Sequence, residues 1–221
     1  MKTAIAIVSL CLLAPASALA QTQTQAQSQP EAPRPAAATL KPAKGAAVPV
    51  DERGFIRRWR VREPFPVPGR LTESAVEEAV KAAALSPEAE QDSAWHALDT
   101  TNYNVNLYHF AWALSKPTSN VLFWVETVVE APGEMRNVRL AIGSNAASRW
   151  WLNGEPVIAL NDDRQSVIDD GVSKRVTLRS GRNVIRAAVI NGGGATDFCA
   201  RFLDENDRPI PGLRVSLQGA Q

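Results

Sequence analysis

The sequence predicts a mostly β protein folded as a β-sandwich, with one helix near the start of its folded part. Two observations favour this fold class. Segments rich in β-branched and aromatic residues recur from residue 121 to residue 217, with polar turns between them at short, fairly regular spacing. In addition, the alternating segment 148–152 runs directly into Asn153-Gly154, the dipeptide most typical of a two-residue hairpin turn.

The first twenty residues have the features of a secretory signal peptide rather than of a folded element. Lys2 supplies the basic start, an apolar segment follows, and Ala18-Leu19-Ala20 forms a small-residue cleavage sequence before Gln21. The apolar segment is too short to cross a bilayer. We therefore expect an exported protein, periplasmic or extracellular, with no membrane span.

A linker and a single domain are predicted to follow. Residues 21–50 are rich in Gln, Ala and Pro and contain no aromatic residue, so they predict a disordered tether. The β-sandwich domain is expected at residues 51–221, with the sandwich core at about 95–217.

The charge balance and the cysteine content argue against a nucleic-acid partner and against an internal disulfide. The chain has 24 basic and 23 acidic residues and no basic stripe, which argues against a nucleic-acid partner. Cys11 lies in the predicted signal peptide, so Cys199 is the sole cysteine expected after export. We predict no internal disulfide and interpret Cys199 as a small buried hydrophobic residue.

The folded part is predicted to open with a strand and a helix. Residues 55–61 have the pattern of a strand that Pro64-Phe65-Pro66 ends. Residues 72–85 predict a helix, with Thr72 as N-cap and Ser86-Pro87 as its stop. Its apolar stripe is mostly alanine, so the helix must pack closely against another element or lie on the surface.

Residues 103–112 alternate in polarity and predict a strand. One face would be aromatic, while the other would carry apolar residues and a histidine; the first set is Tyr108, Phe110 and Trp112, and the second is Val105, Leu107 and His109. An exposed aromatic stripe of this size would mark a partner-binding surface, whereas a buried one would belong to the core.

The Trp-Trp strand carries the main candidate for a binding surface. By strand parity, Trp150 and Leu152 share one face, and Arg149 and Trp151 share the other. If the first face belongs to the core, Trp151 presents an indole beside a guanidinium on the outside. Such an indole is a platform for a flat ligand such as a sugar ring; the alternative is that both tryptophans serve packing.

Four further features occur in a recognisable order: Gly143-Ser144, Trp151 to Gly154, Leu178 to Asn183, and Phe198 to Phe202 before Asp204. In this order, from about Val121 to Pro211, the chain resembles a galactose-binding-domain-like jelly roll. The resemblance implies an accessory module of the kind found in secreted glycoside hydrolases and carbohydrate esterases. Two earlier segments, Trp59 with residues 64–66 and Trp95 to Phe110, resemble the opening of related modules in proteins labelled acetylxylan esterase.

The resemblance also proposes loop residues for the ligand site. Alongside Trp151 and Arg149, it places Asn145 in the loop before the Trp-Trp strand and Asn191 and Asp197 at the glycine-rich loop. Each of these residues also has a structural interpretation, as a capping, turn or strand-end residue. For any one residue taken alone, the structural role is favoured over the ligand-binding role.

No metal or cofactor is predicted. PA14-type relatives of this fold bind calcium through adjacent aspartates in the loop where this chain reads Asn145-Ala146. The aspartates elsewhere match no ligand spacing and are interpreted as solvated turn residues; they are Asp162, Asp163, Asp169 and Asp170.

Catalytic residues are not predicted either. The chain lacks a G-x-S-x-G sequence, and its two histidines, His96 and His109, are not part of any recognisable constellation. A non-catalytic, carbohydrate-associated binding module is therefore the first hypothesis. An envelope protein that binds a partner, such as a separate hydrolase, is the second. A small carbohydrate esterase is the third, and it requires a histidine within hydrogen-bond reach of Ser, Asp or Glu.

Overall fold

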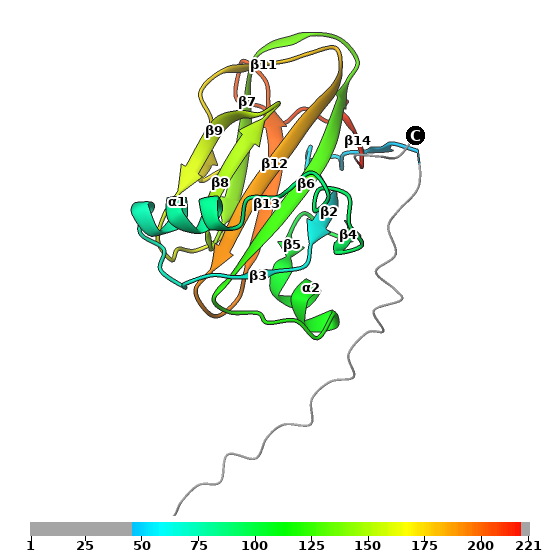
Figure 1. The fold of residues 1–221 in the computed structure, drawn as a ribbon. Helices are drawn as coiled ribbons and strands as arrows, with labels where there is room; N and C mark the ends of the chain where they lie inside the picture. The colour runs from blue at the N-terminus through cyan, green and yellow to red at the C-terminus, as the bar shows by residue number, and fades with distance from the viewer. Residues whose placement is uncertain (1–45, 218–221) are drawn as a thin grey trace, which may run out of the picture. The chain divides into compact units, whose positions relative to one another are not determined.

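Two antiparallel β-sheets make up most of the part of the chain that the computed structural model describes, residues 46–217 (Figure 1). The nine-stranded sheet contains β1 (Val48–Pro49), β2 (Arg58–Arg62), β3 (Phe65–Pro66), β4 (Trp95–Asp99), β6 (Val121–Ala131), β8 (Ala147–Leu152), β9 (Glu155–Leu160), β12 (Gly181–Asn191) and β14 (Arg214–Ser216). The five-stranded sheet contains β5 (Val105–Asn106), β7 (Met135–Ser144), β10 (Gly171–Val172), β11 (Val176–Leu178) and β13 (Asp197–Leu203). The predicted all-β sandwich is confirmed.

Strands β6 and β12 form the central pair of the larger sheet. All eleven residues of β6 pair with β12, from Val121 with Asn191 to Ala131 with Gly181. Alternate residues of β6 face the inter-sheet core, and Leu122 and Trp124 between them belong to a second apolar cluster on the outside. Burial on both faces explains why this strand is a nearly continuous apolar run rather than a clean alternation.

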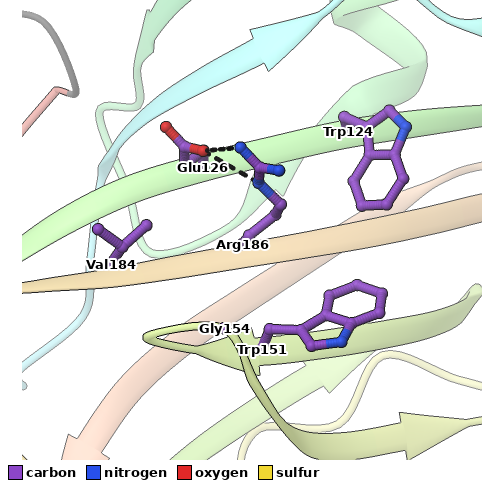
Figure 2. Close-up of a pocket in the computed structure, with 6 residues that line it drawn as sticks. All are labelled: Trp124, Glu126, Trp151, Gly154, Val184 and Arg186. Carbon is purple, nitrogen blue, oxygen red and sulfur yellow. Dashed lines mark hydrogen bonds and ion pairs between the residues drawn. The ribbon is translucent and has the colours of Figure 1, made fainter. Parts of the chain in front are cut away.

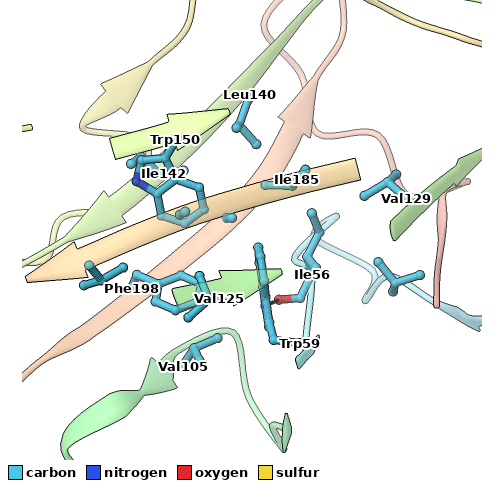
Figure 3. Close-up of a cluster of buried hydrophobic side chains, with 14 of the residues drawn as sticks. Ile56, Trp59, Val105, Val125, Val129, Leu140, Ile142, Trp150, Ile185 and Phe198 are labelled. Atoms are coloured by element: carbon cyan, nitrogen blue, oxygen red, sulfur yellow. Dashed lines mark hydrogen bonds between the residues drawn. The ribbon is translucent and has the colours of Figure 1, made fainter. Parts of the chain in front are cut away.

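Three aromatic side chains meet in the core between the sheets (Figure 3). The ring of Phe198 lies 5.0 Å from that of Trp59 and 5.3 Å from that of Trp150, centroid to centroid, both edge to face. The indole N–H of Trp150 donates to Ser148 Oγ, so burial leaves no polar atom of this ring unpaired. Trp150 therefore faces the core, as strand parity predicts.

Helix α1 (Glu73–Ala82) lies against the outer face of the larger sheet, where Figure 1 shows it beside β8. Val76, Ala79 and Ala83 pack there with Ala147 and Ala188. Small side chains on both surfaces let the helix approach the strands closely, which accounts for its alanine-rich stripe. The helix is shorter than predicted, and Thr72 precedes it without a side-chain capping hydrogen bond.

The prediction of a strand over residues 103–112 is wrong. Most of this segment forms helix α2 (Leu107–Ala113), which follows the short β5. Asn106 caps the helix through a 2.7 Å hydrogen bond from the backbone N–H of His109 to its side-chain oxygen. The buried residues Leu107, Phe110 and Ala111 then follow a helical period rather than a strand period.

The helix also removes the predicted aromatic stripe. Phe110 is buried, whereas Tyr108 and Trp112 are half-buried, and residues two apart on a helix do not share a face. His109, expected beside Val105 and Leu107, is exposed on this helix instead. The proposed partner-binding surface built from these aromatics is therefore not present.

Strand pairing in the described residues begins at Val48, before residue 51. The predicted signal peptide and most of the predicted linker lie outside the described residues, but Val48 and Pro49 form β1 and pair with Val215 and Arg214. Phe65-Pro66, expected only to end a strand, forms β3 against Val121 and Leu122. No helix of residues 46–217 is long and apolar enough to span a membrane.

Cys199 is buried on β13, as predicted. Desolvation of the thiolate raises the pKa of this thiol to about 11, although a hydrogen bond from the Gly143 backbone acts in the opposite direction. The thiol is therefore neutral at physiological pH and behaves as a small apolar group.

Replacing Trp150 with alanine tests the assignment of the two faces of β8. We expect Trp150→Ala to lower the free energy of unfolding by about 3–5 kcal/mol, because it empties a large core position. Trp151→Ala should cost clearly less, because that ring is half-buried on the other face. Urea denaturation measures both, and equal losses would contradict the assignment.

Candidate functional site

The outer face of the larger sheet carries a row of polar and aromatic side chains across four strands. Glu126 on β6 is the register partner of Arg60 on β2 and of Arg186 on β12, and Arg186 in turn pairs with Trp151 on β8. Directly opposite residues share a face of the sheet. The strand register alone thus brings an acid, two bases and an indole together.

A pocket of about 320 Å³ opens on this row. We call it the Trp124 pocket, and it is lined by Trp124, Glu126, Trp151, Gly154, Val184 and Arg186 (Figure 2). The rings of Trp124 and Trp151 have centroids 5.8 Å apart and an angle of 38° between their planes. The pocket therefore combines an aromatic wall with a charged surface, and the turn at Gly154 borders it.

An ion-pair network fixes the charged side of the pocket. Glu126 is fully buried and accepts hydrogen bonds from Arg60 at 3.0 Å and from Arg186 at 2.7 Å. The guanidinium of Arg186 also donates to Glu90, at 2.8 Å, in the segment that follows α1. The guanidinium of Arg60 stacks 4.1 Å above the ring of Trp95.

Each charge in this network is compensated, which affects the pKa values and the kind of ligand the pocket suits. Burial acts to lower the pKa of the Arg186 guanidinium, but hydrogen bonds to Glu90 and Glu126 outweigh it and raise this pKa above its ordinary value. Arg186 therefore stays charged, but its charge is shared by two carboxylates. The pocket offers polar atoms without a net charge.

The two tryptophans of the pocket differ in how their indole N–H groups are used. Trp124 donates to the Ala83 carbonyl at the end of α1, which fixes its ring in place. No residue within 46–217 accepts a hydrogen bond from the indole N–H of Trp151. Buried indole N–H groups normally have an acceptor within the protein. Because the N–H of Trp151 has none among these residues, it is available to donate to a ligand.

Arg149 shares the outer face with Trp151, as strand parity predicts, but it is nearly buried. Its guanidinium donates to Glu77 at 2.6 Å, to Asn161 at 2.8 Å and to the Leu160 carbonyl at 2.9 Å. These contacts hold α1 and the end of β9 against the sheet. Arg149 thus positions the surroundings of Trp151 rather than presenting a free guanidinium beside it.

The three predicted loop residues do not line the Trp124 pocket. Asn145 and Asp197 do meet, because the Asn145 side chain accepts from the Asp197 backbone N–H at 2.9 Å and donates to the Ala195 carbonyl. Asn191 is buried and donates to Thr118 and Gly194. The Asp197 carboxylate accepts from Asn104 at 3.2 Å. All these contacts stabilise loops.

His96 has an acidic neighbour, which is part of what a hydrolase would require. Its Nε2 lies 3.2 Å from Glu63 Oε1, and Lys116 Nζ lies 2.5 Å from the other oxygen of Glu63. Partial burial acts to raise the pKa of Glu63, but hydrogen bonds from Lys116 and His96 outweigh it and hold this pKa below its ordinary value. The cluster ties β2 and β4 to the end of α2.

Two of the four predicted turn aspartates are engaged in ion pairs. Asp169 binds Arg201, and Asp170 binds Arg164. Within residues 46–217, no group of three or more His, Cys, Asp or Glu side chains is placed to hold a metal ion.

Sequence reasoning located Trp151 but missed the other side of the pocket. Trp124, Glu126 and Arg186 lie on predicted strands for which the sequence named no site residue. A signal was present: Glu126 interrupts the apolar run 121–129, and Arg186 interrupts 183–190. Opposite charges in two buried strands indicate a cross-strand pair, but only the register shows that these two meet.

Comparisons with known proteins give distant likenesses only. No family model matches the chain, and no curated protein matches it. Among solved structures, a β-glucosidase from Kluyveromyces marxianus aligns at 14% identity and a TM-score of 0.41 over 74% of this chain and 20% of its own. This chain thus spans about a fifth of that enzyme.

Two further structures align at lower scores. A GH31 α-xylosidase from Xanthomonas citri has 12% identity and a TM-score of 0.30, over 80% of this chain and 18% of its own. A family 35 carbohydrate binding module from Clostridium thermocellum has 14% identity and a TM-score of 0.26, over 73% of this chain and 99% of its own. Scores this low do not establish a shared fold.

Removing the fully buried Glu126 should cost more stability than removing the partly exposed Glu90. We expect Glu126→Ala to lower the free energy of unfolding by about 3 kcal/mol, because it leaves two arginines without their buried partner. Glu90→Ala also removes a carboxylate from Arg186, but its side chain is partly exposed, so a loss of at most about 1 kcal/mol is expected. Urea denaturation compares them, and the reverse order would contradict the network.

The Glu63 cluster predicts a pH-dependent contribution to stability. Because the folded-state pKa of Glu63 is lowered, its ionised form stabilises the fold fully above the ordinary carboxylate pKa of about 4.3. That contribution is lost as pH falls through the folded value. Glu63→Gln should therefore be less stable than the unaltered protein at pH 7, and the difference should shrink toward pH 3 in urea titrations. A difference that does not change with pH would contradict this role.

Proposed function

We propose that this protein is an exported, non-catalytic carbohydrate-binding module whose ligand binds in the Trp124 pocket against Trp151. The observation that carries the proposal is the half-buried indole of Trp151, which faces a second indole and lies beside the Glu126–Arg186 pair. The predicted signal peptide at residues 1–20 supports export to the periplasm or the cell exterior.

The chemistry of the pocket suits a sugar ring. The C–H groups of a pyranose face pack on an indole, while its hydroxyl groups need donors and acceptors at the ring edge. Trp124 and Trp151 supply the aromatic surfaces, and the partly exposed Arg186 supplies polar atoms that its hydrogen bonds to the buried Glu126 hold in place. Groups held in place before binding reduce the entropy lost on association.

The size and charge of the pocket narrow the ligand further. At about 320 Å³ the pocket is near the lower end of the range of roughly 300–1,000 Å³ found for small-molecule sites. It therefore suits a single ring rather than a large cofactor. Because Arg186 is already compensated by two carboxylates, the pocket has no free positive charge to favour an anionic ligand.

Affinity electrophoresis against a panel of plant and bacterial polysaccharides tests the proposal. We expect retardation of the purified chain by at least one neutral polysaccharide. Trp151→Ala should weaken binding at least tenfold, or about 1.4 kcal/mol, whereas Trp151→Phe should keep part of it because an aromatic face remains.

The matched control is Trp112→Ala, which removes another half-buried indole, on α2 and outside the pocket. It should leave retardation unchanged, and circular dichroism checks that each variant is folded. No retardation by any polysaccharide would overturn the proposal, and full retardation of Trp151→Ala would place the ligand elsewhere.

A further inference from the structure

Trp151 borders a second hollow besides the Trp124 pocket. This hollow, of about 280 Å³, is lined by Glu77 from α1, by Arg149, Trp150 and Trp151 from β8, and by residues 156–159 of β9. We call it the Glu77 hollow. Trp151 lines both cavities, so its ring is a surface that they share.

The two cavities extend to opposite sides of β8. In the register of the sheet, Trp151 pairs with Arg186 of β12 on one side and with Pro156 of β9 on the other. Arg186 lines the Trp124 pocket and Pro156 lines the Glu77 hollow. Because neighbouring strands are about 4.8 Å apart, β12 and β9 are separated by roughly 10 Å.

The orientation of the Trp151 ring gives each side of β8 a different part of the indole. Figure 2 shows its indole nitrogen on the edge of the ring turned away from Trp124. One part of the ring thus faces the Trp124 pocket, while the N–H points elsewhere and has no acceptor among residues 46–217. A ligand confined to the Trp124 pocket would not use this donor.

The Glu77 hollow repeats the chemistry of the Trp124 pocket. Arg149 Nε donates to Glu77 Oε1 at 2.6 Å, and Arg149 is held in turn by Asn161 and Leu160. Glu77 has no other partner among the described residues, so its Oε2 remains an acceptor, and about half of its side chain is exposed. Each cavity therefore offers a compensated Arg–Glu pair beside an indole.

We propose that the two cavities are consecutive subsites for an unbranched, neutral oligosaccharide that crosses β8 over Trp151. This inference rests on the proposed function and adds the ligand class, a chain rather than a single terminal sugar. Compensated charges in both cavities favour a neutral, hydroxyl-rich ligand. The Glu77 hollow and the Trp124 pocket lie next to each other on either side of the Trp151 ring. Two linked sugar units could therefore occupy one cavity each.

Chain-length dependence of affinity tests this inference. The probes are oligosaccharide ladders of glucose, xylose, mannose and galactose, one to six units long, titrated into the full chain by calorimetry. We expect affinity for at least one ladder to rise at least tenfold between the monosaccharide and the trisaccharide, and then to level off.

Two variants separate the subsites. Glu77→Ala removes the exposed carboxylate, and Ala159→Leu fills the hollow from β9 without changing the ion pair. Both should weaken trisaccharide binding about tenfold and leave monosaccharide binding within twofold. Glu73→Ala is the matched control, because it removes an exposed acid from the same helix outside both cavities and should change neither affinity.

The outcomes distinguish this inference from the proposed function. Affinity that does not depend on chain length, or variants that bind the trisaccharide normally, would overturn the two-subsite inference and leave a single-ring site. Failure of all four ladders would also overturn it; the proposed function would then survive only if polysaccharide retardation, lost in Trp151→Ala, were still observed.

Discussion

The antiparallel pairing of β6 with β12 joins eleven residues of each strand, and both faces of the sandwich depend on it. On the inner face it places Val125 and Ile185 in the core with Trp150 and Phe198. On the outer face the same register brings Glu126 opposite Arg186. A shift of one residue would exchange the two faces, so core packing and the candidate site cannot be specified separately.

A buried carboxylate organises the outer face. Glu126 is withdrawn from water, which is costly unless its charge is paired and hydrogen-bonded. Arg60 and Arg186 supply that pairing, and Arg186 extends the network to Glu90 beyond the sheet. The polar side of the Trp124 pocket is therefore held by several contacts at once, and a ligand would meet groups that are already oriented.

Helix α1 gives the outer face its second set of constraints. Its carbonyl end holds the ring of Trp124 through Ala83, and its exposed Glu77 is held by Arg149. Both cavities beside Trp151 thus depend on how this helix packs. The close approach that its alanines permit therefore shapes both cavities.

The sequence alone determined the sandwich, the Asn153-Gly154 hairpin, the buried Cys199 and the opposite faces of Trp150 and Trp151, because strand period and turn chemistry are local properties. It failed at residues 107–113, where the apolar residues fit either period and the Asn106 cap with tertiary burial selected the helix. Only the tertiary structure decided that Trp151 meets Trp124, Glu126 and Arg186, and that Arg149 is buried beneath Glu77. These residues lie far apart in the chain, and strand register and helix packing, which no local pattern encodes, bring them together.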